Sequence, residues 1–166
     1  MNRRLLATYL NDHMAGSVGA VQLVRRAAAS NRGTPYGAAL ARLAEEIEED
    51  RAALGRIMQR LGVRQDRVKA ALAWSAEKLG RLKLNGMLIG YSPLSRLEEL
   101  EILELGVTGK LLMWQALGRA TDLDLPQAEL DRLIERARSQ RRRIERQRLH
   151  AAAEAFSGGD AAETDT

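Results

Sequence analysis

The feature that most constrains this chain is its division into long segments whose apolar residues recur at intervals of three and four. This spacing places the apolar side chains along one face of a helix. Short stretches rich in Gly, Pro, Asn and Asp separate the segments, and such stretches end helices. The helical segments predicted in this way are about 3–29, 37–61, 65–89, 93–119 and 126–156.

The lengths of these segments indicate how they pack. A helix of about 25 residues is about 37 Å long, and long helices joined by loops of a few residues pack antiparallel. We therefore predict an all-α, antiparallel up-and-down helical bundle of about five helices, built as a single domain from residues 1–156. Residues 157–166 are small and acidic, and we expect them to form a disordered tail.

Composition narrows the functional classes. The sequence has no cysteine, so it can form neither a disulfide nor a thiolate metal site. Its 26 basic and 22 acidic residues indicate a surface of mixed charge rather than a dedicated binder of polyanions. Because the sequence lacks both a long uncharged apolar run and a signal peptide, we expect no membrane span and a cytoplasmic location.

Several ionisable residues fall on the apolar faces when successive residues are placed about 100° apart. Two glutamates of the fourth segment, Glu101 and Glu104, fall on its apolar face, whereas its Glu98 and Glu99 fall away from the centre of that face. The inward ionisable residues predicted from all segments are His13, Asp50, Arg51, Glu101, Glu104, Arg141 and Arg148.

One interpretation of these residues is an internal ion-pair network. Moving a charge into the interior costs several kcal/mol unless partners compensate it. Three acids (Asp50, Glu101 and Glu104) face three arginines (Arg51, Arg141 and Arg148), and His13 is expected to hydrogen-bond to a carboxylate. This interpretation predicts a non-enzymatic bundle without a cofactor, whose network sets helix register and whose surface contacts a second copy or a partner.

Long helices with inward glutamates and a histidine also resemble the ferritin-like bundle proteins. The resemblance covers four of the five segments, with the third as a possible connector. It implies a metal-binding or redox bundle holding iron or manganese, because di-iron sites in that family use one Glu from each of two helices and Glu-x-x-His from each of the other two. The ligands here would be His13, Asp50, Glu101 and Glu104. This sequence contains no Glu-x-x-His, and its nearest counterpart is Glu101-x-x-Glu104.

Residues 136–148 form the most basic run, with seven arginines and one glutamate. A basic helix can bind nucleic-acid phosphates or an acidic partner. Aromatic residues for base stacking are absent nearby, which disfavours nucleic acid. The acidic run Glu45–Asp50 could instead meet these arginines.

The stretch Gly106–Lys110 has the outline of a phosphate-binding loop. Its glycine spacing and the Leu that follows Lys110 do not fit that motif. We interpret it as part of a helix whose small residues allow close packing.

Overall fold

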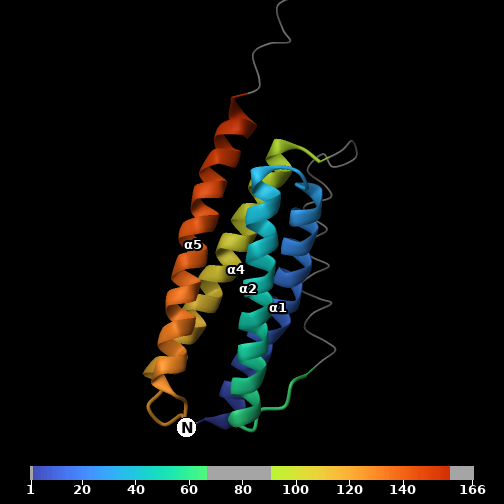
Figure 1. The fold of residues 1–166 in the computed structure, drawn as a ribbon. Helices are drawn as coiled ribbons and strands as arrows, with labels where there is room; N and C mark the ends of the chain where they lie inside the picture. Colours follow the sequence, from blue (N-terminus) through green and yellow to red (C-terminus); the bar gives the residue numbers. More distant parts are fainter. Residues whose placement is uncertain (1, 67–90, 158–166) are drawn as a thin grey trace, which may run out of the picture.

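A computed structural model of the protein describes residues 2–66 and 91–157, which form four long helices and no strand (Figure 1). The helices are α1 (Arg3–Ser30), α2 (Pro35–Arg60), α4 (Pro93–Arg119) and α5 (Gln127–Phe156). The all-α prediction is confirmed for these residues. The predicted segment 65–89 and the predicted tail lie almost wholly outside the described residues, and the two residues of that segment that are described, 65 and 66, are not helical.

Local chemistry fixes several of the helix ends. Proline at the first helical position begins both α2 and α4, where its fixed φ suits the helix and its missing N–H is not needed. The hydroxyls of Thr34 and Ser92 cap these helices. Each accepts a hydrogen bond from the backbone N–H three residues later, that of Gly37 and Ser95 respectively. After α2, Gly62 adopts a φ of +68°, and the N–H of Val63 donates a hydrogen bond to the carbonyl of Met58 in the last turn of the helix.

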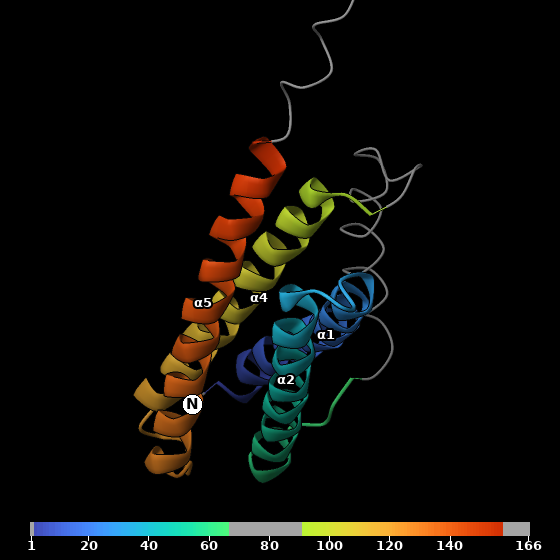
Figure 2. The ribbon, with the colours of Figure 1, turned by 45° about the horizontal axis from the view of Figure 1, so that its top comes forward.

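The four helices form a bundle in which every neighbouring pair is antiparallel. Helices α1 and α5 run upward in Figure 1, and α2 and α4 run downward. The closest packing is within two pairs, α1 with α2 and α4 with α5, and these pairs meet where α1 contacts α4 and α2 contacts α5 (Figure 2). Residues 61–92 connect the lower end of α2 to the upper end of α4, so these two helices run in the same direction.

The apolar core consists of two clusters, one above the other. The upper cluster includes Val24, Leu40, Leu100 and Ile144, and the lower one includes Leu10, Met58, Trp114 and Leu130. Along α2, α4 and α5, a polar side chain lies at the boundary between the clusters. These boundary residues are Asp50, Lys110 and Gln140.

A second polar cluster holds the upper end of the bundle together. The Glu99 carboxylate, only 4% exposed, accepts hydrogen bonds from Arg26 and from the Tyr91 hydroxyl. Buried Asn31 donates to Tyr91 and accepts from Arg96, whose guanidinium lies 4.4 Å from the centre of the Tyr36 ring. The prediction that Glu99 falls away from the apolar face is therefore wrong, because α4 packs against both α1 and α5 and buries a wide arc.

We expect Gly37→Ala to destabilise the protein. A Cβ at residue 37 would lie 2.3 Å from the backbone oxygen of Asn31, so the turn between α1 and α2 would have to move, at a cost of about 1–3 kcal/mol. Gly118→Ala is the matched control, because its Cβ would meet Gln127 at an ordinary 3.6 Å. The control should gain about 0.5–1 kcal/mol from helix propensity. Urea unfolding measures both, and equal effects would refute the close approach at Gly37.

Candidate functional site

The centre of the bundle contains a closed set of polar contacts from three helices. Asp50 of α2 is 2% exposed, and its Oδ2 pairs with the Lys110 ammonium of α4. The same ammonium donates to Gln140 Oε1 of α5, and Gln140 Nε2 donates to Asp50 Oδ2 at 3.0 Å. Each of the three side chains thus contacts the other two. We call these three residues the central polar layer.

Arg136 is the second cation that lies beside the buried Asp50 carboxylate. Its guanidinium pairs with Asp50 Oδ1 and also with the exposed Glu49 carboxylate, at 2.8 Å. Each oxygen of Asp50 is therefore within ion-pair distance of a cation of the chain, although Oδ1 accepts no hydrogen bond of good geometry. Burial lowers the pKa of Lys110 below its ordinary value, and the Asp50 carboxylate opposes this effect. The charges of the layer are compensated inside the bundle, as a buried ion pair requires.

The ion pairs continue one turn along the contact between α2 and α5. Glu46 precedes Asp50 by four residues and pairs with Arg143. Burial alone would raise the pKa of Glu46, but hydrogen bonds from Arg143 and Gln140 outweigh it and hold the pKa below its ordinary value. The acidic edge of α2 thus meets the basic edge of α5, in agreement with the pairing expected between the two charged runs.

The predicted ion-pair network does not form as one unit. Glu104 pairs with Arg141 at 3.0 Å, and Glu101 pairs with Arg148 at 3.6 Å, but the Glu101 side chain is 50% exposed. The Glu104 side chain is 18% exposed, and its Oε2 is buried without a hydrogen-bond partner among the described residues. Neither of these two pairs includes Asp50. Arg51 is exposed and makes no ion pair with any described residue, so the structure does not place it in the predicted internal network.

The four predicted metal ligands are not gathered either. His13 and Asp50 line one cavity, whereas Glu101 and Glu104 do not line it. His13 stacks edge-on against Tyr9, with ring centres 4.7 Å apart, and burial lowers its pKa against the opposing effect of Asp12. Within residues 2–66 and 91–157, no three His, Cys, Asp or Glu side chains are placed to hold a metal ion. The di-iron centre implied by the ferritin-like resemblance therefore does not fit these residues.

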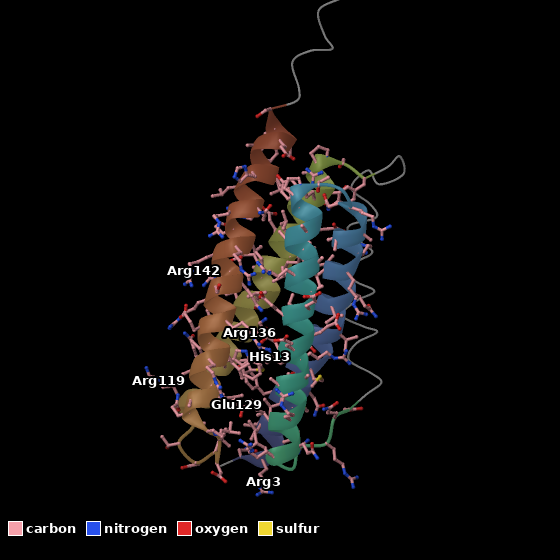
Figure 3. All side chains as sticks on the ribbon, viewed as in Figure 1. Arg3, His13, Arg119, Glu129, Arg136 and Arg142 are labelled. Atoms are coloured by element: carbon pink, nitrogen blue, oxygen red, sulfur yellow. The ribbon has the colours of Figure 1, made fainter. Side chains whose placement is uncertain are left out.

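The cavity lies beside the central polar layer, between α1, α2 and α4, and has a volume of about 330 Å³. His13 of its α1 wall and Arg136 of the neighbouring ion pairs lie near the middle of the bundle's height (Figure 3). Three glycines, Gly16, Gly106 and Gly109, line the cavity, and a Cβ on any of them would have no neighbour within 4 Å. The prediction that Gly106–Lys110 serves close packing is therefore wrong, because these glycines border open space.

The arginine-rich run of α5 is largely neutralised within the bundle. Four of its seven arginines pair with acids of α2 or α4, and two others pair with Glu135 of α5. Arg146 is the member without an ion pair among the described residues. Little uncompensated charge is left for a polyanion along this helix.

Sequence reasoning missed Lys110 and Gln140, although a signal for both is present. Lys110 continues the apolar series Leu103 and Val107 at the same spacing of three and four, and Trp114 follows it. Gln140 likewise lies between Ala137 and Ile144. A polar residue within an unbroken apolar series indicates a buried polar contact, as it does for Asp50.

Comparison of the chain with protein-family models, with curated proteins and with solved structures finds no match. Among the described residues, no helix is long and apolar enough to cross a membrane.

We expect Asp50→Asn to cost about 3–5 kcal/mol of unfolding free energy, because it leaves Lys110 and Arg136 facing each other without a counter-charge. The matched control is Glu49→Gln on the neighbouring residue, which pairs with the same Arg136 but is 66% exposed. The control should stay within about 0.5 kcal/mol of wild type. Urea unfolding measures both variants. Similar small losses for both would show that Asp50 is not buried among cations.

Proposed function

We propose that this protein is a non-enzymatic helical bundle of ferritin-like general form. In it, the Lys110 ammonium lies where a ferritin-like bundle would hold a metal cation. In this proposal the central polar layer sets the register of the helices, and the protein acts through contact with a second copy or a partner. The observation that carries the proposal is the Asp50 carboxylate, which is buried and has both oxygens engaged by Lys110 and Arg136.

The direction of the helices supports the ferritin-like form. Ferritin-like bundles have two antiparallel helix pairs joined by one long crossover. Here α1–α2 and α4–α5 are the antiparallel pairs, and residues 61–92 join the end of α2 to the opposite end of α4. In such bundles, inward carboxylates of facing helices hold metal cations between them. Here the Lys110 ammonium lies beside the inward carboxylate of Asp50.

The contact with a second copy rests on a separate observation. Two leucines of α4, Leu105 and Leu112, are 69% and 57% exposed and lie two turns apart on the same side of the helix. Exposed apolar side chains that adjoin one another are typical of protein contact surfaces. We therefore propose the outer face of α4 as the surface through which the chain forms a homo-oligomer, and light scattering of the purified protein would determine its mass in solution.

Replacing the internal cation tests the proposal. Lys110→Ala removes the ammonium and three methylene groups, and the vacated space adjoins the cavity. We expect the variant to unfold at a lower temperature and to be stabilised by n-propylammonium, which replaces the missing atoms and the charge. The expected rise in Tm is about 2–4 °C. The neutral 1-propanol and the bulkier tetramethylammonium should have no such effect.

Arg141→Ala is the control variant, since the Arg141 side chain is 44% exposed and does not line the cavity, so its removal leaves no enclosed site for an amine. Wild-type protein incubated with iron(II) or manganese(II) should retain only traces of metal after dialysis. Stoichiometric metal that is lost in Asp50→Asn would contradict the proposal. Equal rescue by propylammonium and tetramethylammonium would also contradict it, because it would show a general salt effect.

A further inference from the structure

The cavity beside the central polar layer has properties that the ion network does not explain. Most of its lining is apolar, and the apolar side chains come from all three surrounding helices. They include Ala20, Ile47, Leu54, Ile102, Val107 and Met113. A well-packed core leaves few voids larger than a water molecule. A space of about 330 Å³ is therefore much larger than ordinary packing defects.

The volume sets the size of a molecule that would fill this cavity. An engineered apolar cavity of about 150 Å³ binds benzene. The present cavity, at about 330 Å³, is roughly twice that volume, so a two-ring molecule would fit. It also lies at the lower end of the range of small-molecule sites in proteins. Exposed lining residues, including Asp12 and Leu105, mark where the cavity reaches the surface.

The charges around the cavity indicate a neutral ligand. Lys110 and Asp50 compensate each other, and Asp12 and Arg51 carry opposite charges. Burial lowers the pKa of His13 and so disfavours its charged form. No net charge therefore favours a cation or an anion. An ionic ligand would lose its hydration without gaining a counter-charge.

One buried donor shows which polar group the ligand should carry. Trp114 lines the cavity and is completely buried, yet its indole N–H has no hydrogen-bond partner among the described residues. Tryptophan N–H groups usually find an acceptor when they are buried, since an unpaired buried donor is costly. The N–H has no accessible surface of its own, so a ligand with a carbonyl oxygen would supply the missing acceptor only after the side chains that cover the indole move aside.

From these observations we infer that the cavity between α1, α2 and α4 is a binding site for a small, neutral, two-ring apolar molecule with a carbonyl acceptor, which the Trp114 indole N–H recognises. Gly16, Gly106 and Gly109 keep the space open, since a side chain at any of them would project beside it. This inference does not depend on the proposed role of Lys110, and the two are tested by different measurements.

A pair of matched probes tests the size and the acceptor separately. 1-Tetralone and tetralin share the same two-ring skeleton, and only 1-tetralone has a carbonyl oxygen. Isothermal titration of the wild-type chain should give a Kd for 1-tetralone on the order of 10–100 µM. Tetralin should bind about threefold to tenfold more weakly, which corresponds to one hydrogen bond. The anion 1-naphthoate should bind more weakly than 1-tetralone.

Three variants connect the binding to this cavity. Gly106→Leu fills the space and also replaces a poor helix former, so the variant should fold and lose binding of both probes. Ala116→Leu places the same side chain on an exposed part of α4 outside the cavity and should bind as wild type does. Trp114→Phe keeps an aromatic ring but removes the donor, so it should bind 1-tetralone and tetralin equally. Circular dichroism verifies that each variant is folded.

Three results would overturn the inference. Failure of both probes to bind the wild-type chain would show that the cavity is not accessible, for example because another part of the chain or a second copy fills it. Binding that survives in Gly106→Leu would place the ligand elsewhere. Equal affinity of the wild-type chain for 1-tetralone and tetralin would remove the role of the Trp114 donor and with it the ligand class. In each case the propylammonium rescue of Lys110→Ala would remain an independent test of the proposed function.

Discussion

The structure depends on one interaction, the buried contact between the Asp50 carboxylate and the Lys110 ammonium. A single buried charge would cost several kcal/mol, and the pair avoids that cost only when α2, α4 and α5 are in register. Gln140 makes the requirement stricter, because its amide accepts from Lys110 and donates to Asp50 at the same time. A shift of α2, α4 or α5 by one turn would leave at least one of these groups buried and unpaired. Apolar clusters above and below the layer supply the driving force for packing, and in the function that we propose the polar layer selects the register.

The sequence allowed the helices to be predicted with bounds close to those found, because proline, glycine and capping residues mark their ends. The inward side of α2 was predictable in part: Asp50, which interrupts its apolar stripe, is buried, but Arg51, also predicted to face inward, is exposed. The inward side of α4 was not. This helix packs against α1 and α5 and buries residues over a wide arc, so an analysis based on one face exchanged buried Glu99 for exposed Glu101. Helical periodicity locates a residue on its own helix but gives no information about how many neighbours that helix has.

The candidate site illustrates the same limit. Three predicted acids do meet basic residues, but the partners of Asp50 are Lys110 and Arg136, and not Arg51. Pairing between helices depends on their relative rotation and height, which a single sequence does not specify. The cavity was not predictable either, because Gly106 and Gly109 have the same sequence signature whether a helix packs closely against them or leaves space. The polar layer and the cavity are neighbours, because Asp50 and Lys110 also line the cavity.

A double-mutant cycle with the near-isosteric substitutions Asp50→Asn and Lys110→Met tests the account most directly. The unfolding free energies of wild type, both single variants and the double variant give the coupling between the two side chains. If this contact holds the helices in register, each single variant leaves one of the two buried charges without the other. The double variant removes both charges, so the coupling free energy should be about 1.5–3 kcal/mol. Additive effects, within about 0.5 kcal/mol, would show that Asp50 and Lys110 do not interact in the folded protein and would contradict the account.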